Sequence, residues 1–373
     1  MVARRSLSDA ERVDWLRLAR TENVGPVTFR ELLARYRTAA AALEALPELA
    51  RRGGRRAPLR VPPPGAARRE IDAAGRAGGR LIALVEPAYP PLLAHITDPP
   101  PLLYALGHAH LLGADAVGVV GARNASAAGI RFAGRLAADL GAGGLVVVSG
   151  LARGIDAAAH EGALPSGTVA VMAGGVDVVY PADNQGLYER IREAGALISE
   201  QPLGTVPQGR HFPRRNRLIS GLSLGVVVVE ATPRSGSLIT ARFAGEQGRE
   251  VFAVPGSPLD PRARGANQLI RQGAVLTEGA RDVIEVLAGR RRAPMEEGAE
   301  MPFAAAGPVT EDAGALAAGR AAVVEKLGPT PVAVDELIRQ CQVTAAIVQL
   351  VLLELELAGQ LDRHPGNQVS VRM

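Results

Sequence analysis

The stretch FPRRNRLISGLSLGVVVV, residues 212–229, decides the fold and gives the first indication of a ligand. It ends in an almost wholly apolar segment, Gly225 to Val229, as expected of a strand in a parallel sheet that is buried on both faces. The preceding residues predict a helix, and polar side chains at its start would face the rim of the sheet: Arg214, Arg215, Asn216 and Arg217. Guanidinium groups bind phosphate oxygens and stack on bases, and an asparagine amide can bond a base edge.

The chain around this stretch, from about residue 115 to 288, alternates apolar strands with amphipathic helices. The strand candidates are Ala116–Val120, Leu145–Val148, Val169–Met172, Ala196–Ile198, Val226–Val229, Val251–Val254 and Ala274–Leu276. This alternation predicts an α/β fold, a Rossmann-like doubly wound parallel sheet covered by helices on both faces. We assign residues 80–288 to this domain, with Leu81–Val85 as a further short strand before it.

Residues 1–70 predict a helical domain of the SAM or helix-hairpin-helix kind. Its signature is the turn Asn23–Val27, an apolar-Gly-Pro-apolar sequence that either offers backbone N–H groups to phosphate or forms a simple helical corner. Within it, residues 51–70 are basic and rich in Pro and Gly, so we expect a flexible connection there.

Residues 289–317 predict a linker, and residues 318–373 predict a winged helix with a hairpin at Pro365–Asn367. Its recognition helix would span about 344–358, and this helix is mostly Val, Leu and Ile. From residue 320 onward the basic residues are Arg320, Lys326, Arg339, Arg363 and Arg372, and the acidic ones are Glu325, Asp335, Glu336, Glu354, Glu356 and Asp362. Because this balance is slightly acidic and opposes contact with DNA phosphates, we expect the domain to bind protein instead.

Composition sets further bounds on the function of the 373-residue chain. The net charge of +4 and the pI of about 9.7 are compatible with a nucleic-acid partner. Lys326 is the only lysine, so the abundance of arginine is a bias of the whole chain and only the placement of arginines is informative. The single cysteine, Cys341, excludes an internal disulfide and a multi-cysteine metal site. We find no signal peptide or membrane-spanning segment, and therefore expect a cytoplasmic protein without a membrane partner.

The unusual residues of the predicted sheet follow its strands, at the edge where doubly wound folds bind ligands. Gly121-Ala122-Arg123-Asn124 follows the first strand, Ser149-Gly150-Leu151-Ala152-Arg153 the second, and Arg234-Ser235-Gly236-Ser237 the fifth. Glycine and serine let backbone N–H groups and hydroxyls approach anionic oxygens closely. Together with Arg123, Arg153, Arg215 and Arg217, these loops predict a polyanion site at the rim.

The same loops argue against nucleotide enzymes. The first turn lacks G-x-G-x-x-G, the second strand ends in Ser149-Gly150 without an acidic residue, and no P-loop is present. Asp156 and His160 are near the predicted rim, but a structural hydrogen bond is the expected role of His160. Since no nucleophile–base pair or metal cluster stands out, we expect no catalytic residues, no metal and no cofactor, and so no enzyme.

These motifs, in this order, resemble the DNA-processing protein A family, DprA or Smf. The resemblance covers about residues 80–280, through the motifs YPPLL at 89–93, VGAR at 120–123, SGLARGID at 149–156, FPRRNR at 212–217 and SGSLITA at 235–241. It continues through VPG at 254–256 and GANQLI at 265–270. The flanking helical and winged-helix domains also fit the family's architecture.

The resemblance implies a homodimer that binds and protects single-stranded DNA and loads RecA recombinase onto it in natural transformation. It places Gly121, Arg123, Arg215, Asn216 and Arg217 in the strand-binding pocket. Position within the rim adds further members: Ala122, Gly150, Arg153, Arg214, Gly236 and Ser237. One departure is Ala122, where the family often has serine or threonine, so a hydroxyl contact is lost while the backbone amide remains.

Two other functions stay open from the sequence. A nucleotide-processing hydrolase of the phosphoribohydrolase-like Rossmann group is the first, but such enzymes use a Pro-Gly-Gly-x-Gly-Thr loop followed by a catalytic glutamate. The nearest glycine pair here, Gly174-Gly175, continues as Val-Asp-Val-Val-Tyr-Pro. The second is a duplex-binding regulator that would use the winged helix, which conflicts with the acidic balance of that domain.

Overall fold

The computed structural model describes residues 4–292, 313–364 and 366–372. It divides into two compact units, each described by itself. The terminal unit combines Met1–Arg68 with Ala299–Met373, and the sheet unit is Arg69–Gly298. In the described part of the chain, no helix is both long and apolar enough to cross a bilayer.

Among the described residues, the sheet unit is built on nine strands in the order β1-β2-β6-β5-β4-β3-β7-β8-β9. Strands β3 to β9 run parallel to one another, whereas β2 is antiparallel to both β1 and β6. The bounds are β1 Gly79–Ala83, β2 Leu102–Gly107, β3 Ala116–Gly121, β4 Val146–Ser149, β5 Thr168–Val171, β6 Ala196–Ser199, β7 Gly225–Val229, β8 Glu250–Ala253 and β9 Val275–Leu276. The sheet grows outward from β3 in one direction and from β7 in the other, which makes the β3–β7 boundary the topological switch point. The predicted doubly wound fold is confirmed.

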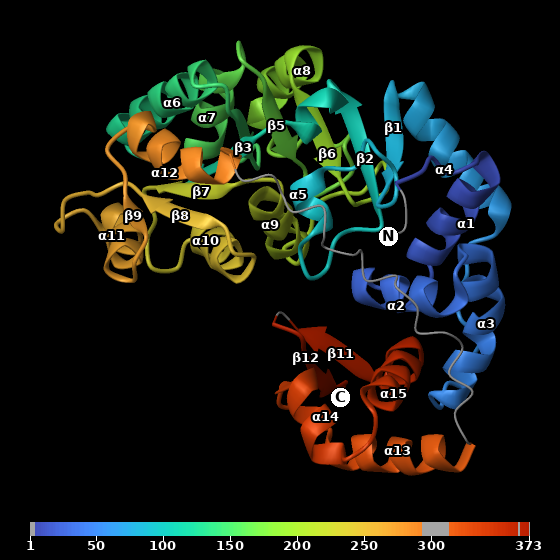
Figure 1. Ribbon diagram of the computed structural model, residues 1–373. Helices are drawn as coiled ribbons and strands as arrows, with labels where there is room; N and C mark the ends of the chain where they lie inside the picture. The colour runs from blue at the N-terminus through green and yellow to red at the C-terminus, as the bar shows by residue number, and fades with distance from the viewer. Residues whose placement is uncertain (1–3, 293–312, 365, 373) are drawn as a thin grey trace. The chain divides into compact units, whose positions relative to one another are not determined.

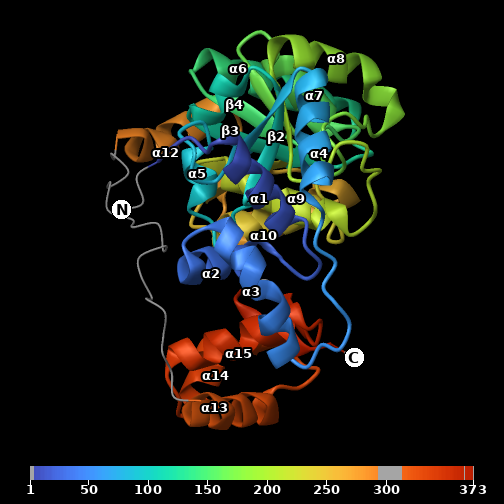
Figure 2. The ribbon, with the colours of Figure 1, turned by 90° about the vertical axis from the view of Figure 1, so that its right-hand side faces the viewer.

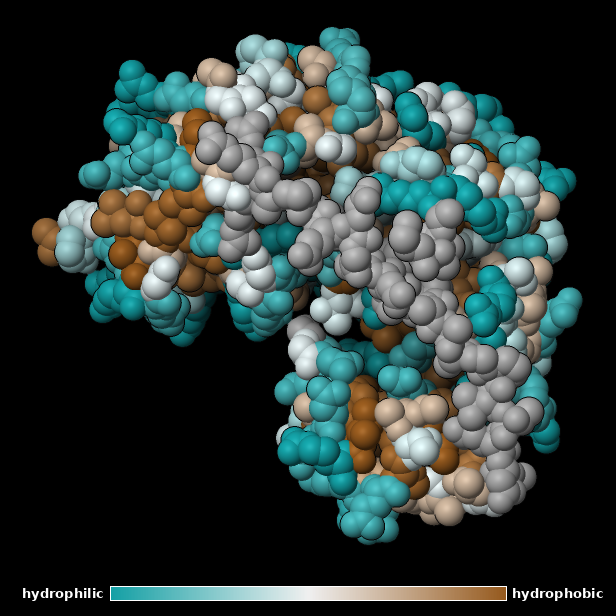
Figure 3. Space-filling view, in the orientation of Figure 1, coloured by the Kyte–Doolittle hydropathy of each residue, from teal (hydrophilic) through white to brown (hydrophobic). Residues whose placement is uncertain are grey.

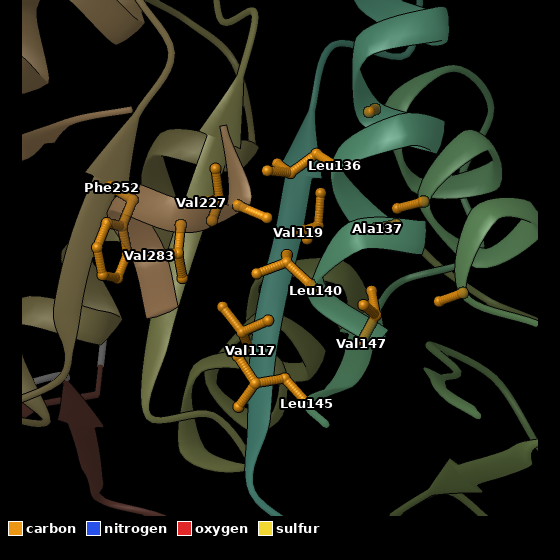
Figure 4. Packing of buried hydrophobic residues seen from close by; sticks show 14 of the residues in the cluster. Val117, Val119, Leu136, Ala137, Leu140, Leu145, Val147, Val227, Phe252 and Val283 are labelled. Carbon is orange, nitrogen blue, oxygen red and sulfur yellow. The ribbon is translucent and has the colours of Figure 1, made fainter. Parts of the chain in front are cut away.

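Helices cover both faces of this sheet, with α6, α7 and α12 on one face and α9 and α10 on the other (Figure 1). The α-helices that follow β3 in this unit are α6 Ala127–Ala142, α7 Ile155–Ala163, α8 Gln185–Ala194, α9 His211–Gly221, α10 Ser237–Glu246, α11 Arg264–Arg271 and α12 Ala280–Arg292. Under α6, Val117 and Val119 of β3 pack against Leu136 and Leu140 of that helix, and all four side chains are buried (Figure 4). Burial from both sides explains why the strands are nearly continuous runs of valine.

Two segments differ from the sequence-based expectation. Strand β2 was not predicted, because Leu102–Gly107 follows a run of prolines and its partners β1 and β6 are distant in sequence. The flexible connection expected over 51–70 is wrong in its second half, where helix α4 spans Pro64–Arg76. Proline is tolerated in the first turn of a helix, where its missing N–H has no helical acceptor. The prolines at 62–64 therefore precede and begin a helix.

The N-terminal part of the terminal unit contains α1 (Asp9–Ala19), α2 (Pro26–Tyr36) and α3 (Ala39–Arg52). Helix α1 begins with a capping box in which the Ser8 hydroxyl accepts from the Glu11 amide while the Glu11 carboxylate accepts from the Ser8 amide. Trp15 of α1 packs edge-on against Phe29 of α2, with ring centroids 5.0 Å apart. This arrangement matches the predicted helical domain.

The C-terminal part of this unit is a winged helix, as predicted. It contains α13 (Ala313–Lys326), α14 (Val334–Cys341) and α15 (Ala345–Leu357), which Figure 2 shows, and the strands β10 (Val332–Ala333), β11 (Leu361–His364) and β12 (Gln368–Val371) in the order β10-β12-β11. Of the predicted linker 289–317, residues 293–312 lie outside the described residues, and α12 and α13 occupy its two ends. The domain boundaries given above stay predictions.

Candidate nucleic-acid interface

A stack of one exposed arginine, the half-buried ring of Phe212 and the exposed ring of Tyr180 lies at the rim of the sheet. Cζ of Arg123, in the loop after β3, is 5.1 Å from the ring centroid of Phe212. The ring of Tyr180 lies on the loop between β5 and α8, with its centroid 5.6 Å from that of Phe212. Arg123 is exposed, and 48% of Tyr180 is exposed. The stack therefore offers a cation and π surfaces to solvent at one place.

Phe212 and Tyr180 were not among the predicted site residues. Aromatic residues make up only 3% of the chain, and these two positions are 32 residues apart in sequence, from 180 to 212. A signal was present, because each aromatic residue directly precedes a proline, at Pro181 and Pro213, in a segment that follows a predicted strand. Only the fold brings the two segments together.

Arg215 forms part of the floor of this rim. Only 5% of the residue is exposed, and Nη1 donates to the carbonyl oxygens of Gly150, at 2.6 Å, and of Val171. A Cβ built on Gly150 would lie 2.2 Å from the same nitrogen, so the close approach requires glycine. Burial lowers the pKa of Arg215 to about 10, which leaves the guanidinium charged at neutral pH.

The carboxylate that balances this buried charge is Asp156 in the first turn of α7. It accepts from the amides of Gly150 at 3.2 Å and Ala152 at 3.4 Å. Burial raises the pKa of Asp156, and the positive charge of Arg215 opposes that rise. The predicted structural role of His160 is confirmed, since it is fully buried with Nδ1 2.7 Å from Oγ1 of Thr168. Burial lowers the pKa of His160 to about 3, so it is neutral.

Arg217, two residues further along α9 on the same predicted motif, is also buried. Its Nε lies 3.0 Å from Oδ2 of Asp98, and its Nη2 lies 2.6 Å from Oε2 of Glu200. These ion pairs tie α9 to the segment before β2 and to the end of β6. Arg215 and Arg217 therefore have protein partners, and their direct contact with DNA stays a prediction.

The other predicted cations of the rim are on its surface. Arg214 is exposed, and Arg153 is an exposed side chain whose Nη2 lies 2.6 Å from Oδ2 of Asp183. Asn216 is half-buried, and its Nδ2 donates to the carbonyl oxygen of Gly236 at 3.2 Å. The rim therefore combines a buried charged floor with an exposed positive edge.

The remaining predicted members shape the loops around the stack. A Cβ on Gly121 would lie 1.9 Å from the carbonyl oxygen of Val229, so this glycine permits close packing of β3 against β7. The carbonyl oxygen of Ala122 accepts from the amide of Ile155 at 3.2 Å. The hydroxyl oxygen of Ser237, at the start of α10, lies 2.7 Å from that of Ser235.

The N-terminus of α6, where dinucleotide-binding folds hold a pyrophosphate, is occupied by a carboxylate. Glu230, with φ of 52°, accepts from the amide of Ser126 at 2.8 Å and from the hydroxyl of that serine. A Cβ on Gly129 would lie 2.7 Å from the Glu230 carboxylate. This negative charge disfavours a phosphate at the same position and agrees with the absence of the dinucleotide motif.

The glycine pair considered for a hydrolase has structural neighbours. A Cβ on Gly174 would lie 2.3 Å from the carbonyl oxygen of Thr205. Beside it, Asp177 accepts from the amide of Gly204 at 2.8 Å. The pair therefore packs against the 202–207 loop. Within residues 4–292, 313–364 and 366–372, no cluster of three or more His, Cys, Asp or Glu side chains could hold a metal ion.

Comparisons with known proteins agree with this arrangement. The family model of DNA recombination-mediator protein A matches residues 80–288. The DprA-like N-terminal HHH domain matches residues 9–73, and the DprA winged helix domain matches residues 307–367. The first of these matches alone covers more than half of the chain.

Individual relatives support the same assignment. The DNA processing protein DprA of Bacillus subtilis is 45% identical over 216 residues, which are 57% of this chain and 73% of the relative. The X-ray structure of DNA processing protein A from Streptococcus pneumoniae is similar with a TM-score of 0.60 and 32% identity, over 75% of this chain and 98% of that one. DNA processing protein A from Helicobacter pylori, whose structure was described for its single-stranded DNA binding mode, has a TM-score of 0.51 and 30% identity over 54% of this chain and 93% of its own. The chain with the Arg123–Phe212–Tyr180 rim thus belongs to the DprA/Smf family of DNA recombination mediators.

Proposed function

We propose that this protein binds single-stranded DNA at the rim of its sheet. The stack of Arg123, Phe212 and Tyr180 carries this proposal, because partly exposed rings beside an exposed cation fit unpaired bases and the adjoining phosphates together. In a duplex the faces of the bases are covered by their neighbours, so ring stacking favours the single strand. The Helicobacter pylori relative, described for its single-stranded DNA binding mode, supports the same ligand.

The exposed residues of the rim would contact the strand, and the buried ones would position them. We assign phosphate contacts to the exposed cations Arg153 and Arg214, and base contacts to Phe212 and Tyr180, with Arg123 serving both. Arg215 would act as a positioning residue that holds the loop ends after β4 and β5 while adding positive charge from beneath. Gly121, Ala122, Gly150, Asn216, Arg217, Gly236 and Ser237 would shape the surface.

The proposal also covers the step after strand binding. Because the matching family model describes a DNA recombination mediator, we propose that this protein protects incoming single strands in the cytoplasm and loads RecA onto them. The measurement is the lag before RecA hydrolyses ATP on a strand precoated with single-strand-binding protein. We expect the protein to shorten this lag and Arg123→Ala to restore it. An unchanged lag, with strand binding intact, would reject the loading step alone.

We further propose a homodimer formed at the β9 edge of the sheet unit. The exposed apolar side chains Leu259, Leu276 and Val286 lie on the segments around β9, and Figure 3 shows apolar surface over β8 and β9. An exposed strand edge with apolar side chains favours association with a second copy. Sedimentation of the wild type as a dimer and of Leu276→Asp as a monomer is the expected result, and a monomeric wild type would reject the dimer.

Strand binding is tested by fluorescence anisotropy with labelled oligothymidine and a duplex of equal length across a salt series. We expect tight binding to the single strand that weakens steeply with salt, because bound phosphates release counterions. Arg123→Ala should cost about 1–3 kcal/mol of binding free energy. The control Arg281→Ala removes an equal charge from an exposed position on α12 and should leave the affinity unchanged. Equal losses in both variants, or equal binding of both nucleic acids, would contradict the proposal.

A further inference from the structure

Helix α15 carries buried apolar side chains on more than one side, which is unusual for the recognition helix of a winged helix. One side, with Val348, Val351 and Leu355, belongs to the core of the winged helix. Leu350, Leu353 and Leu357 are also buried, at 3%, 2% and 0% exposure, but lie outside that core. Their spacing of three and four residues forms a second apolar stripe on the helix. A helix with two apolar stripes must be covered on more than one side.

The second side of α15 is covered by the N-terminal helices of the same terminal unit. Gly53, at the C-terminus of α3, approaches so closely that a Cβ there would lie 1.9 Å from the carbonyl oxygen of Glu354 and 2.8 Å from Cβ of Ala358. Nδ2 of Asn23 donates to the carbonyl oxygen of Leu357 at 3.3 Å. The last turn of α15 is therefore bonded to the turn that precedes α2.

Charged groups at this contact are paired across it. Nε of Arg363, on β11, lies 2.6 Å from Oε2 of Glu356 on α15, and its Nη2 lies 3.2 Å from Oε1 of Glu31 on α2. The side chain of Arg363 is 15% exposed. On the other side of α15, the carboxylate of Glu354 is fully buried and pairs with Arg320 of α13. Both acidic residues of the predicted recognition helix thus have basic partners in the terminal unit.

The turn before α2 is the one that resembles a helix-hairpin-helix. A Cβ on Gly25, the N-cap of α2, would lie 3.8 Å from Oε1 of Glu356. A carboxylate therefore faces the helix N-terminus, which is where such a hairpin would offer its N–H groups to a DNA phosphate. The two elements of the terminal unit with a sequence signature of DNA binding cover one another.

We propose that the partner of the winged helix is the N-terminal helical domain of its own chain, and that this contact closes both α15 and the 23–27 turn to nucleic acid. Three features support this contact. The second apolar stripe of α15 lies on the side covered by α3, and Asn23 bonds the C-terminus of α15. Arg363 lies between the carboxylates of Glu31 and Glu356. This inference is independent of strand binding at the sheet rim, which lies in the other unit.

The test is hydrogen–deuterium exchange on the full chain. We expect slow exchange at the amides of 345–357 and of the 23–27 turn in the wild type. Arg363→Glu places a third carboxylate beside Glu31 and Glu356 and should speed exchange of the turn by about tenfold or more. The matched control Arg339→Glu makes the same change at an exposed side chain of α14 that pairs with Glu336, and should not affect the turn.

Two further variants distinguish loss of this contact from misfolding of the winged helix. Asn23→Ala removes the bond to Leu357 without adding charge and should speed exchange of the turn by several-fold. The double variant Glu31→Arg with Arg363→Glu restores one ion pair and should recover part of the protection lost in Arg363→Glu. Recovery would not occur if the single variant merely unfolded the winged helix.

Three results would overturn the inference. Equal exchange of the turn in Arg363→Glu and Arg339→Glu would show that the contact does not form. Loss of protection on dilution of the wild type would show that the partner is a second copy. Duplex binding by the wild type that disappears in Gln349→Glu, a change on an exposed position of α15, would show that the recognition helix is open to DNA.

Discussion

The sheet rim and helix α15 both carry a sequence signature of nucleic-acid binding, but their charged side chains differ in exposure and pairing. At the rim, Arg123 and Arg214 are exposed, and Arg123 lies beside the ring of Phe212. In α15, Glu354 and Glu356 are paired with basic side chains, and the apolar stripe is covered. The exposed rim cations remain available to a ligand, whereas the charges of α15 are desolvated and paired within the terminal unit.

A second contrast lies within the rim itself. The consecutive residues Arg214 and Arg215 differ completely in exposure, because successive side chains on α9 point in different directions about the helix axis. Arg214 faces solvent and Arg215 faces the ends of β4 and β5. A motif of adjacent arginines therefore mixes exposed charges with buried structural supports.

The largest effect is expected from Arg215→Ala. Removal of the buried guanidinium leaves two carbonyl oxygens without their donor and the buried Asp156 without its neighbouring charge. We expect the free energy of unfolding to fall by about 3–5 kcal/mol, as measured by denaturant titration. Arg214→Ala, at the exposed neighbouring position, should change it by less than about 0.5 kcal/mol. Equal free energies of unfolding for the two variants would show that the buried Arg215 stabilises the fold no more than the exposed Arg214 does.

The next effect concerns strand binding by the aromatic rings. Phe212→Ala should weaken binding to oligothymidine by about 1–3 kcal/mol, because stacking on one base is lost. A matched control exists in Phe243 of α10, which carries Arg242 over its ring at 5.4 Å in the same kind of pair. Phe243→Ala should bind the strand as the wild type does. If both variants lose affinity equally, the rim stack is not the binding surface.

The terminal unit should respond to pH through Glu31. Burial raises the pKa of Glu31 to about 7, although Arg363 and Arg30 lower it, and Glu356 adds to the rise. A raised carboxyl pKa means that the folded state holds the proton more tightly than the unfolded chain does. Its stabilising contribution is therefore complete below pH of about 4.5 and lost as the pH rises to about 7.

This pH effect is measurable as a difference between the wild type and Glu31→Gln, which cannot titrate. We expect the free energy of unfolding of the wild type to fall by about 2 kcal/mol relative to the variant between these pH values. Denaturant titrations across the range would measure the difference. Parallel pH profiles for the two proteins would show that Glu31 titrates normally and lies in water.

The smallest effect should come from restoring the hydroxyl that is missing at Ala122. This residue is half-buried beside Arg123, and Ala122→Ser should strengthen strand binding by about 0.5–1.5 kcal/mol if its hydroxyl reaches a phosphate. The anisotropy titration is the measurement, with Ala127→Ser at the exposed start of α6 as the control. No gain in affinity would place the strand away from the β3 loop.

The parallel strands were predictable because burial on both faces requires a continuous run of apolar residues, which is visible in the local sequence. Segments such as Val226–Val229 are apolar at every position, and their ends are marked by glycine and serine. Strand β2 was missed although Leu102–Leu106 is also apolar, because prolines precede it and its antiparallel partners β1 and β6 lie elsewhere in the chain. Helix α4 was missed because the prolines at its start were interpreted as breakers.

The sequence by itself determined the family motifs, the doubly wound sheet and the edge of the sheet where cations gather, because each of these depends on local pattern and on the order of strands. Only the tertiary structure decided which arginines are exposed, that Tyr180 and Phe212 meet beside Arg123, and that α15 is covered by α3. These features depend on contacts between segments distant in sequence. Burial and pairing, which set the energy of a charge, arise from those contacts and are not encoded by residue type alone.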